Sequence, residues 1–177
     1  MTEDEVIEAA HRKAFEQARN EEMAALQPAT PAASLLVVGD STAVGTGATA
    51  PARSVAGMLA SGLPNLRVVN RAADGARYAD IVRQLQDDSA PYDAVLVMGG
   101  GNDVIRGTRS EDLQAQVREV ATLARQRAPF VVLMPPGNVG NAPFFWRPLG
   151  WWMDRRSQVL HAAVREAARA TGASYVN

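Results

Sequence analysis

Five short apolar runs, each bounded by residues typical of turns, most constrain what this chain can fold into. We predict them as strands over residues 35–39, 66–70, 94–98, 130–134 and 174–176. The segments between them are long enough for helices and carry apolar residues at spacings of three and four. Apolar strands that alternate with helices indicate a parallel sheet covered on both faces. We therefore expect an α/β fold, a three-layer α/β/α sandwich.

Four helices are expected between these strands. Ser110 is the expected N-cap of the third, because serine readily caps a helix. The fourth is expected over about residues 152–171, ending at Gly172, since glycine commonly terminates helices. The side chains expected to face the core are Val55, Met58 and Leu59 in the first helix, Tyr78, Ile81, Val82 and Leu85 in the second, and Leu113, Val117, Val120, Ala121 and Ala124 in the third.

The amino-terminal part of the chain differs from the rest. Residues 1–27 are predicted to form a charged helix with a thin apolar stripe, and residues 28–33, which contain Pro28 and Pro31, are predicted to form a linker. The α/β domain then occupies residues 34–177. Two roles stay open for the helix, docking on the domain or self-association, so a homodimer is one expected assembly.

Composition and charge exclude several classes of site. The formal charge of −1 gives no field that would favour nucleic acid or an anionic membrane, and the arginines are scattered along the sequence. The chain has no cysteine, and its two histidines lack the spacing of metal ligands, so we expect neither metal nor cofactor. No apolar stretch approaches the roughly 20 residues of a membrane span. No signal peptide is visible, so we expect a cytoplasmic protein.

Three of the predicted strands end in small and polar residues. Ser41 follows the first strand in Gly39-Asp40-Ser41, Gly75 follows the second and Asn102 follows the third. The ends of parallel strands share one edge of a sheet, where open α/β folds place their sites. Asp40 and Asp103 are expected to hold the turns through bonds to the backbone. Because acyl transfer needs a nucleophile and donors for an oxyanion, Ser41, Gly75 and Asn102 predict a serine hydrolase.

These segments resemble the SGNH hydrolases, the superfamily of GDSL-like esterases and lipases. Gly39-Asp40-Ser41 is similar to the first block of that family, including its nucleophile. Gly75 is similar to the second-block glycine, and Gly100-Gly101-Asn102-Asp103 to the third block, Gly-x-Asn-Asp. The resemblance covers about residues 34–177 and implies a flavodoxin-like parallel sheet of about five strands in the order 2-1-3-4-5. It also implies a serine esterase that forms an acyl-enzyme on Ser41.

The fourth block of the family, Asp-x-x-His, supplies the catalytic base and its orienting acid, and it does not occur in residues 1–177. We expect this block to follow Asn177. His11 lies on the predicted amino-terminal helix, and His161 is expected to face solvent from the last helix, so neither is assigned as the base. A non-catalytic ligand-binding or interaction domain of the same superfamily is the alternative function.

An aromatic segment follows the fourth strand on the expected active edge. Phe144, Phe145 and Trp146 are interpreted as candidate substrate-binding residues, a wall or lid for an apolar pocket. Docking of these rings on the core is an equal alternative, and a contact in a homodimer is a third. The expected substrate is a small-molecule, lipid or glycan ester, and the sequence leaves its acyl and alcohol groups open.

Overall fold

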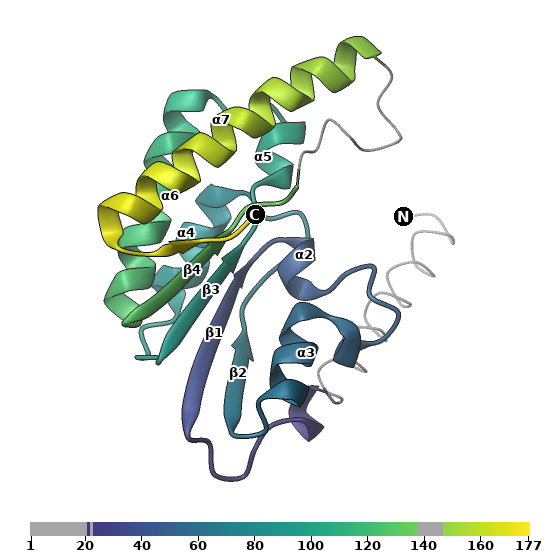
Figure 1. Cartoon of the computed structure of the whole chain (residues 1–177), viewed down its shortest axis with the longest axis vertical. Coiled ribbons are helices and arrows are strands. Elements are labelled where there is room, and N and C mark those ends of the chain that lie inside the picture. Colours follow the sequence, from purple (N-terminus) through teal and green to yellow (C-terminus); the bar gives the residue numbers. More distant parts are fainter. Residues whose placement is uncertain (1–20, 22, 138–146) are drawn as a thin grey trace, which may run out of the picture.

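The structure, a computed structural model, describes residues 21, 23–137 and 147–177 as a five-stranded parallel sheet with helices on both faces (Figure 1). The strand order is β2-β1-β3-β4-β5, and each neighbouring pair is parallel. The predicted sandwich and its strand order are therefore confirmed. The strands are β1 (Ala33–Gly39), β2 (Leu66–Asn70), β3 (Ala94–Met98), β4 (Phe130–Met134) and β5 (Ser174–Tyr175).

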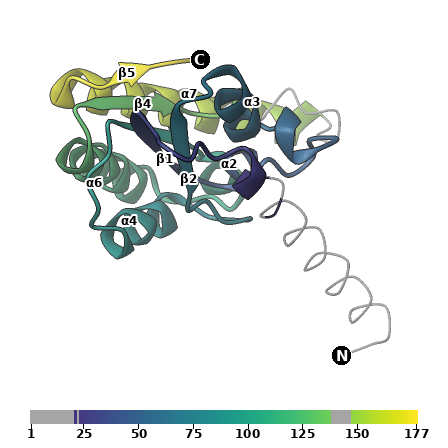
Figure 2. The ribbon, with the colours of Figure 1, turned by 90° about the horizontal axis from the view of Figure 1, so that it is seen from below.

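Helices on the two faces of the sheet connect the strands. Figure 2 shows α3 on the opposite side of the sheet from α4 and α6. Within the described ranges, no helix has the length and apolar character needed to cross a membrane. The helices are α2 (Ser41–Val44), the 3₁₀ helix η1 (Pro51–Arg53), α3 (Val55–Gly62), α4 (Tyr78–Asp87), α5 (Gly101–Ile105), α6 (Ser110–Arg127) and α7 (Arg147–Thr171).

Neighbouring residues of each strand point to opposite helical layers. In β1, Leu36 and Val38 are buried in the core shared with α4, α6 and α7, whereas Leu35 and Val37 belong to the core beneath α3. Successive side chains of a strand alternate between its faces, so a strand buried on both faces must be apolar at every position. This alternation explains why the continuous apolar runs identified the strands.

Several boundaries differ from the sequence predictions. β1 begins at Ala33, β5 ends one residue early, and α7 begins at Arg147 rather than near residue 152. Ser110 is the first residue of α6, and the N-cap is Arg109, which makes no side-chain capping bond. The predicted core stripes of α4 and α6 are buried as expected.

The predicted core-facing stripe of α3 is confirmed in part, since Val55 and Leu59 pack against the core but Met58 does not. Met58 is 62% exposed, and the buried residues of the helix are Ala56, Gly57 and Ala60. A Cβ at Gly57 would lie 2.2 Å from the Pro51 carbonyl oxygen, so η1 and α3 approach too closely for a larger residue. Small residues therefore form much of the buried face of α3, and a search for large apolar side chains does not find them.

The predicted amino-terminal helix lies almost wholly outside the described residues. Of its last residues, Met23 and Leu26 pack against the core beneath α3. The Gln27 side-chain oxygen accepts a hydrogen bond of 2.9 Å from the Val68 N–H. β2 is an edge strand, so this side chain satisfies a backbone donor that no neighbouring strand reaches.

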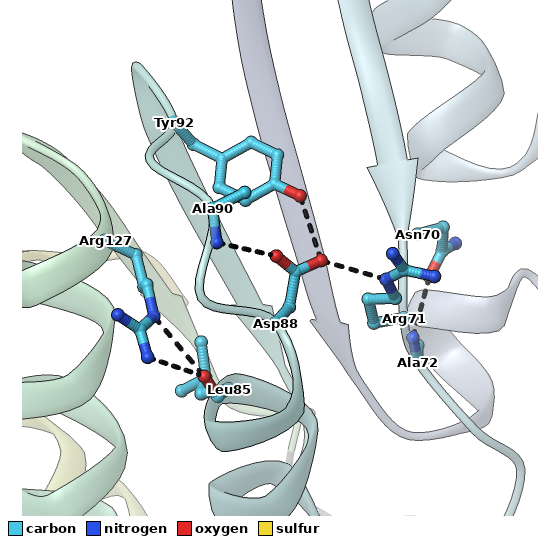
Figure 3. A network of polar contacts seen from close by, with 8 residues as sticks. All are labelled: Asn70, Arg71, Ala72, Leu85, Asp88, Ala90, Tyr92 and Arg127. Atoms are coloured by element: carbon cyan, nitrogen blue, oxygen red, sulfur yellow. Dashed lines mark hydrogen bonds and ion pairs between the residues drawn. The ribbon is translucent and has the colours of Figure 1, made fainter.

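A buried carboxylate joins the end of α4 to the end of β2 (Figure 3). Asp88 accepts hydrogen bonds from Arg71 Nε at 3.0 Å and from the Tyr92 hydroxyl at 2.9 Å. The Ala90 N–H donates a third, at 3.1 Å. Burial raises the pKa of Asp88, but these bonds and the Arg71 charge outweigh it and hold the pKa below 3.8. The network fixes the chain as it leaves β2.

We predict that Asp88→Asn lowers the free energy of unfolding at neutral pH by about 1 kcal/mol. The ionised form of Asp88 stabilises the fold because its pKa is lowered, so this stabilisation is present above the ordinary pKa of 3.8 and is lost as the pH falls through the lowered value. Urea unfolding should therefore show the two proteins converging in acid. Asp87→Asn, at the exposed neighbouring position, is the control and should change little. A difference that stays constant down to about pH 2 would contradict the account.

Candidate active site

The three turns that carry the predicted site residues lie at one edge of the sheet. β1 is central, with β2 and β3 on either side, and all three run parallel. Gly39 at the end of β1 pairs in register with Met98 at the end of β3. The Ala73 N–H, in the loop after β2, donates to the Gly39 carbonyl at 3.1 Å. The carboxyl ends of these three neighbouring strands, and the turns that follow them, therefore lie close to Ser41.

Gly39 closes β1 tightly against β3. Its φ is +148°, and a Cβ here would lie 1.8 Å from the Met98 carbonyl oxygen, so only glycine fits. Gln84 of α4 holds the same residue from the other side. Its side-chain oxygen accepts from the Gly39 N–H at 2.8 Å, and its nitrogen donates to the Gly39 carbonyl at 3.0 Å. The turn before Ser41 is therefore fixed from two sides.

Ser41 is the first residue of α2 and is half-buried. Asp40 is the N-cap of this helix, and its Oδ1 accepts a bond of 2.9 Å from the Thr42 N–H. Burial raises the pKa of Asp40, partly offset by hydrogen bonds from Thr42 and from the backbone of Gly100 and Gly101. The Asp40 N–H also donates to the Met98 carbonyl at 3.0 Å, so Asp40 links the serine turn to the end of β3. Its expected structural role is confirmed.

Gly75 lies in the loop after β2, where the backbone has a φ of +73° that favours glycine. A Cβ at this position would lie 3.4 Å from Arg106 Nη2. The loop is tied to the chain after α2, since Thr46 Oγ1 donates to Asp74 Oδ1 at 2.6 Å. Gly75 thus lies at this edge between the chain after α2 and the Arg106 guanidinium.

Asn102 is the second residue of α5, and its side-chain amide donates to the Ala76 carbonyl at 3.0 Å. This bond brings the turn after β3 to the loop that contains Gly75. A primary amide carries two N–H groups, so the second stays available to another acceptor. Asn102 can therefore join the two turns and still donate to a ligand.

Asp103 is fully buried beside Asn102 and has a structural role. Its Oδ2 accepts from the Tyr78 N–H at 2.9 Å, and its Oδ1 accepts from Thr108 Oγ1 at 2.8 Å. Burial raises the pKa of this carboxyl, although both bonds oppose the effect. Asp103 thereby joins the start of α4 to the end of α5, as the sequence predicted.

The model of the GDSL-like lipase/acylhydrolase family matches residues 37–177, a range that includes all three turns. The chain belongs to this family. No curated protein sequence matches the chain. The resemblance drawn from Ser41, Gly75 and Asn102 is thereby confirmed at the level of the family.

Solved structures share the fold of this GDSL-family chain. LAE5, an α/β hydrolase enzyme from the metagenome of Lake Arreo, has a TM-score of 0.64 and 20% identity, over 84% of this chain and 78% of its own. TesA has a TM-score of 0.63 and 24% identity, over 80% and 76%. A catalytic mutant of Axe2, an acetylxylan esterase from Geobacillus stearothermophilus, has a TM-score of 0.63 and 22% identity, over 84% and 77%.

His161 is placed differently from the sequence prediction. It is half-buried on α7, with Nδ1 2.7 Å from the Tyr175 hydroxyl and Nε2 2.9 Å from the Pro136 carbonyl oxygen. A carbonyl can only accept, so the partners assign the proton to Nε2 and leave Nδ1 to accept from Tyr175. Both ring nitrogens of His161 therefore have partners other than Ser41.

The aromatic residues predicted to contact substrate, Phe144, Phe145 and Trp146, lie outside the described residues. Trp151 and Trp152 are described, and both are exposed on the first turns of α7. In the part of the chain that the structure describes, no group of three or more histidine, aspartate or glutamate side chains could hold a metal ion.

Because a Cβ at position 39 would overlap the Met98 carbonyl, we predict that Gly39→Ala destabilises the fold by about 3 kcal/mol. Gly62→Ala is the matched control, since a Cβ at Gly62 meets no atom within 4 Å and the change should stay within about 0.5 kcal/mol. Urea unfolding of both variants measures the difference. Equal effects would show that the contact between β1 and β3 is looser than described.

Proposed function

We propose that this GDSL-family protein is a serine esterase that cleaves a carboxylic ester through an acyl-enzyme on Ser41. The observation that carries the proposal is the Asn102 hydrogen bond to Ala76. It joins the turn after β3 to the loop of Gly75, while the Asp40 N–H donates to the Met98 carbonyl and so joins the end of β3 to the turn of Ser41. A nucleophile and three N–H donors then share one edge of the sheet, which is the arrangement that acyl transfer requires.

The proposed reaction has two steps. Ser41 Oγ attacks the ester carbonyl carbon, and the electrons of the C=O bond move to the oxygen. The N–H groups of Ser41 and Gly75 and the Asn102 amide donate to this oxyanion. Collapse of the tetrahedral intermediate breaks the bond to the alcohol and leaves the acyl group on Ser41. Water then attacks the acyl-enzyme, releasing the acid and restoring the serine.

A general base must take the proton of Ser41 and pass it to the leaving alcohol. The family resemblance implies a histidine from an Asp-x-x-His block for this role, and residues 1–177 contain no such block. The tests below therefore use a chain that carries one. A chain with the block that binds esters without cleaving them would favour the alternative, a non-catalytic binding domain.

The bond class proposed is a carboxylic ester, in a small-molecule, lipid or glycan substrate. Support comes from the family and from structural relatives whose names describe esterases, among them Axe2 and the psychrotrophic EstA from Pseudoalteromonas sp.. Relatives of this identity support the fold rather than a particular acyl or alcohol group. Turnover of a panel of p-nitrophenyl esters of increasing acyl length would define the length of acyl group that the enzyme prefers.

We predict that Ser41→Ala abolishes turnover of a p-nitrophenyl ester, because the acyl group then has no oxygen to bond to. Ser61→Ala, at an exposed position on α3, is the control and should retain full activity. The same pair should be compared by labelling with a fluorophosphonate, which should modify every chain except Ser41→Ala. Unchanged turnover in Ser41→Ala would refute the assignment of the nucleophile.

We predict that Asn102→Ala lowers kcat by about 10²–10³ with a small change in KM, because an oxyanion donor acts mainly in the transition state. The substitution also removes the bond to Ala76, so its thermal unfolding must be measured alongside. Asn65→Ala, at an exposed position before β2, serves as the control. A folded Asn102→Ala enzyme with less than a threefold loss of kcat would argue against the donor role.

A further inference from the structure

Two tryptophans at the start of α7 form an exposed surface with the end of α5. Trp151 is 63% exposed and Trp152 is 42% exposed, while Ile105, the last residue of α5, is 49% exposed. A Cβ at Gly107 would lie 3.7 Å from Trp152 Cη2, so the tryptophan lies beside the residues that follow α5. Figure 1 shows the first turns of α7 projecting past α5, away from the sheet.

Two arginines lie over these rings, and a third, Arg106, extends from the end of α5 toward Gly75. The Arg155 guanidinium carbon is 4.6 Å from the centre of the Trp151 ring, and that of Arg156 is 4.9 Å from the centre of the Trp152 ring. Arg106 follows Ile105, and its Nη2 lies 3.4 Å from the position of a Cβ at Gly75. The surface therefore reaches from α7 to the rim of the candidate active site.

The charges of these arginines are not neutralised locally. Among the described residues, no salt bridge involves Arg106, Arg155 or Arg156. Arg156 donates instead to the carbonyl groups of Val104, at 3.1 Å, and Thr108. We call this surface the tryptophan–arginine patch; it comprises Ile105, Arg106, Trp151, Trp152, Arg155 and Arg156.

The acidic groups close in sequence to the patch have other partners. Asp103, two residues before Ile105, accepts from the Tyr78 N–H and from Thr108 Oγ1. Asp154 accepts a hydrogen bond of 2.9 Å from Gln158 Nε2. Glu111 lies 3.9 Å from Arg109, a neighbouring arginine outside the patch. Apolar rings and cationic groups therefore share one surface, and the nearby carboxylates interact with residues outside the patch.

We propose that the tryptophan–arginine patch docks on an anionic lipid surface. Tryptophan favours the boundary between water and lipid, and arginine near that boundary is attracted to anionic headgroups. A second copy of the chain fits this patch less well, because a twofold contact would place like-charged arginines against one another. Docking would hold the edge with Gly75 and Asn102 next to the membrane. The proposal itself does not require that the protein be an esterase.

The net charge of −1 does not conflict with this docking. A whole-molecule field would require an excess of positive charge, whereas a lipid surface responds to charges within about a Debye length, about 10 Å in moderate salt. Arg155 and Arg156 are consecutive on α7, and the bonds from Arg156 to the Val104 and Thr108 carbonyls hold α7 beside the segment that carries Arg106. The interaction expected is thus local and oriented.

Intrinsic fluorescence provides a direct test, since the three tryptophans of the chain lie at positions 146, 151 and 152. The full chain should be titrated with vesicles of phosphatidylcholine alone and with vesicles containing a third phosphatidylglycerol. We expect a blue shift of the indole emission and co-flotation with the anionic vesicles, both weakened by salt. Brominated lipids should quench this emission if the rings enter the boundary.

Matched variants assign the binding to the patch. Arg106→Gln and Arg155→Gln should each weaken partitioning about fivefold, the effect of one arginine near an anionic surface. Adding Trp151→Ala to either arginine variant should weaken vesicle partitioning further. Arg118→Gln on α6 and Phe130→Ala, which removes a side chain 72% exposed at the start of β4, are controls for lost charge and lost apolar surface, and both should bind as the parent does.

Equal binding to neutral and anionic vesicles, or equal losses in the controls, would overturn the proposal. So would an absence of vesicle binding, with or without concentration-dependent self-association by sedimentation; self-association would identify a second copy as the occupant. Vesicle binding is measured without turnover, so a protein that binds lipid but cleaves no ester would contradict the proposed function alone. One that cleaves soluble esters but binds no vesicle would contradict the docking alone.

Discussion

The close approach of β1 and β3 at their carboxyl ends is the contact on which the candidate site depends. Gly39 lies against the Met98 carbonyl with no room for a Cβ, and the next residue, Asp40, donates its N–H to the same carbonyl at 3.0 Å. Asp40 Oδ1 then accepts from the Thr42 N–H at 2.9 Å and caps the helix that begins at Ser41. The serine turn and the end of β3 are thus one unit, fixed by backbone contacts within the sheet.

The remaining parts of the site are fastened to that unit by side chains from other elements. Gln84 of α4 binds both backbone groups of Gly39, and Asn102 reaches the carbonyl of Ala76 beside Gly75. Asp88 anchors the end of β2 through Arg71. Donors held by such contacts before a substrate arrives need little reorganisation when charge develops, which is the physical basis of the proposed oxyanion site.

The sequence predicted the sheet and the edge at which the three turns meet, because both follow from local patterns: apolar runs that end in small and polar residues. It did not predict the partners that hold the edge together. Gln84 contacts a residue 45 positions away, and no spacing rule marks it. His161 was expected to face solvent, but its partners come from β5 and from the loop after β4, and only the fold brings them to α7. The tryptophan–arginine patch depends in the same way on where α5 and α7 meet.

A crystal structure of the active protein after reaction with a phosphonate ester, which mimics the tetrahedral intermediate, tests the proposed oxyanion site directly. We expect phosphorus bonded to Ser41 Oγ and one phosphoryl oxygen within about 3 Å of the Ser41 N–H, the Gly75 N–H and the Asn102 amide. Phosphorus on another residue, or a phosphoryl oxygen that points to solvent away from Gly75 and Asn102, would contradict it.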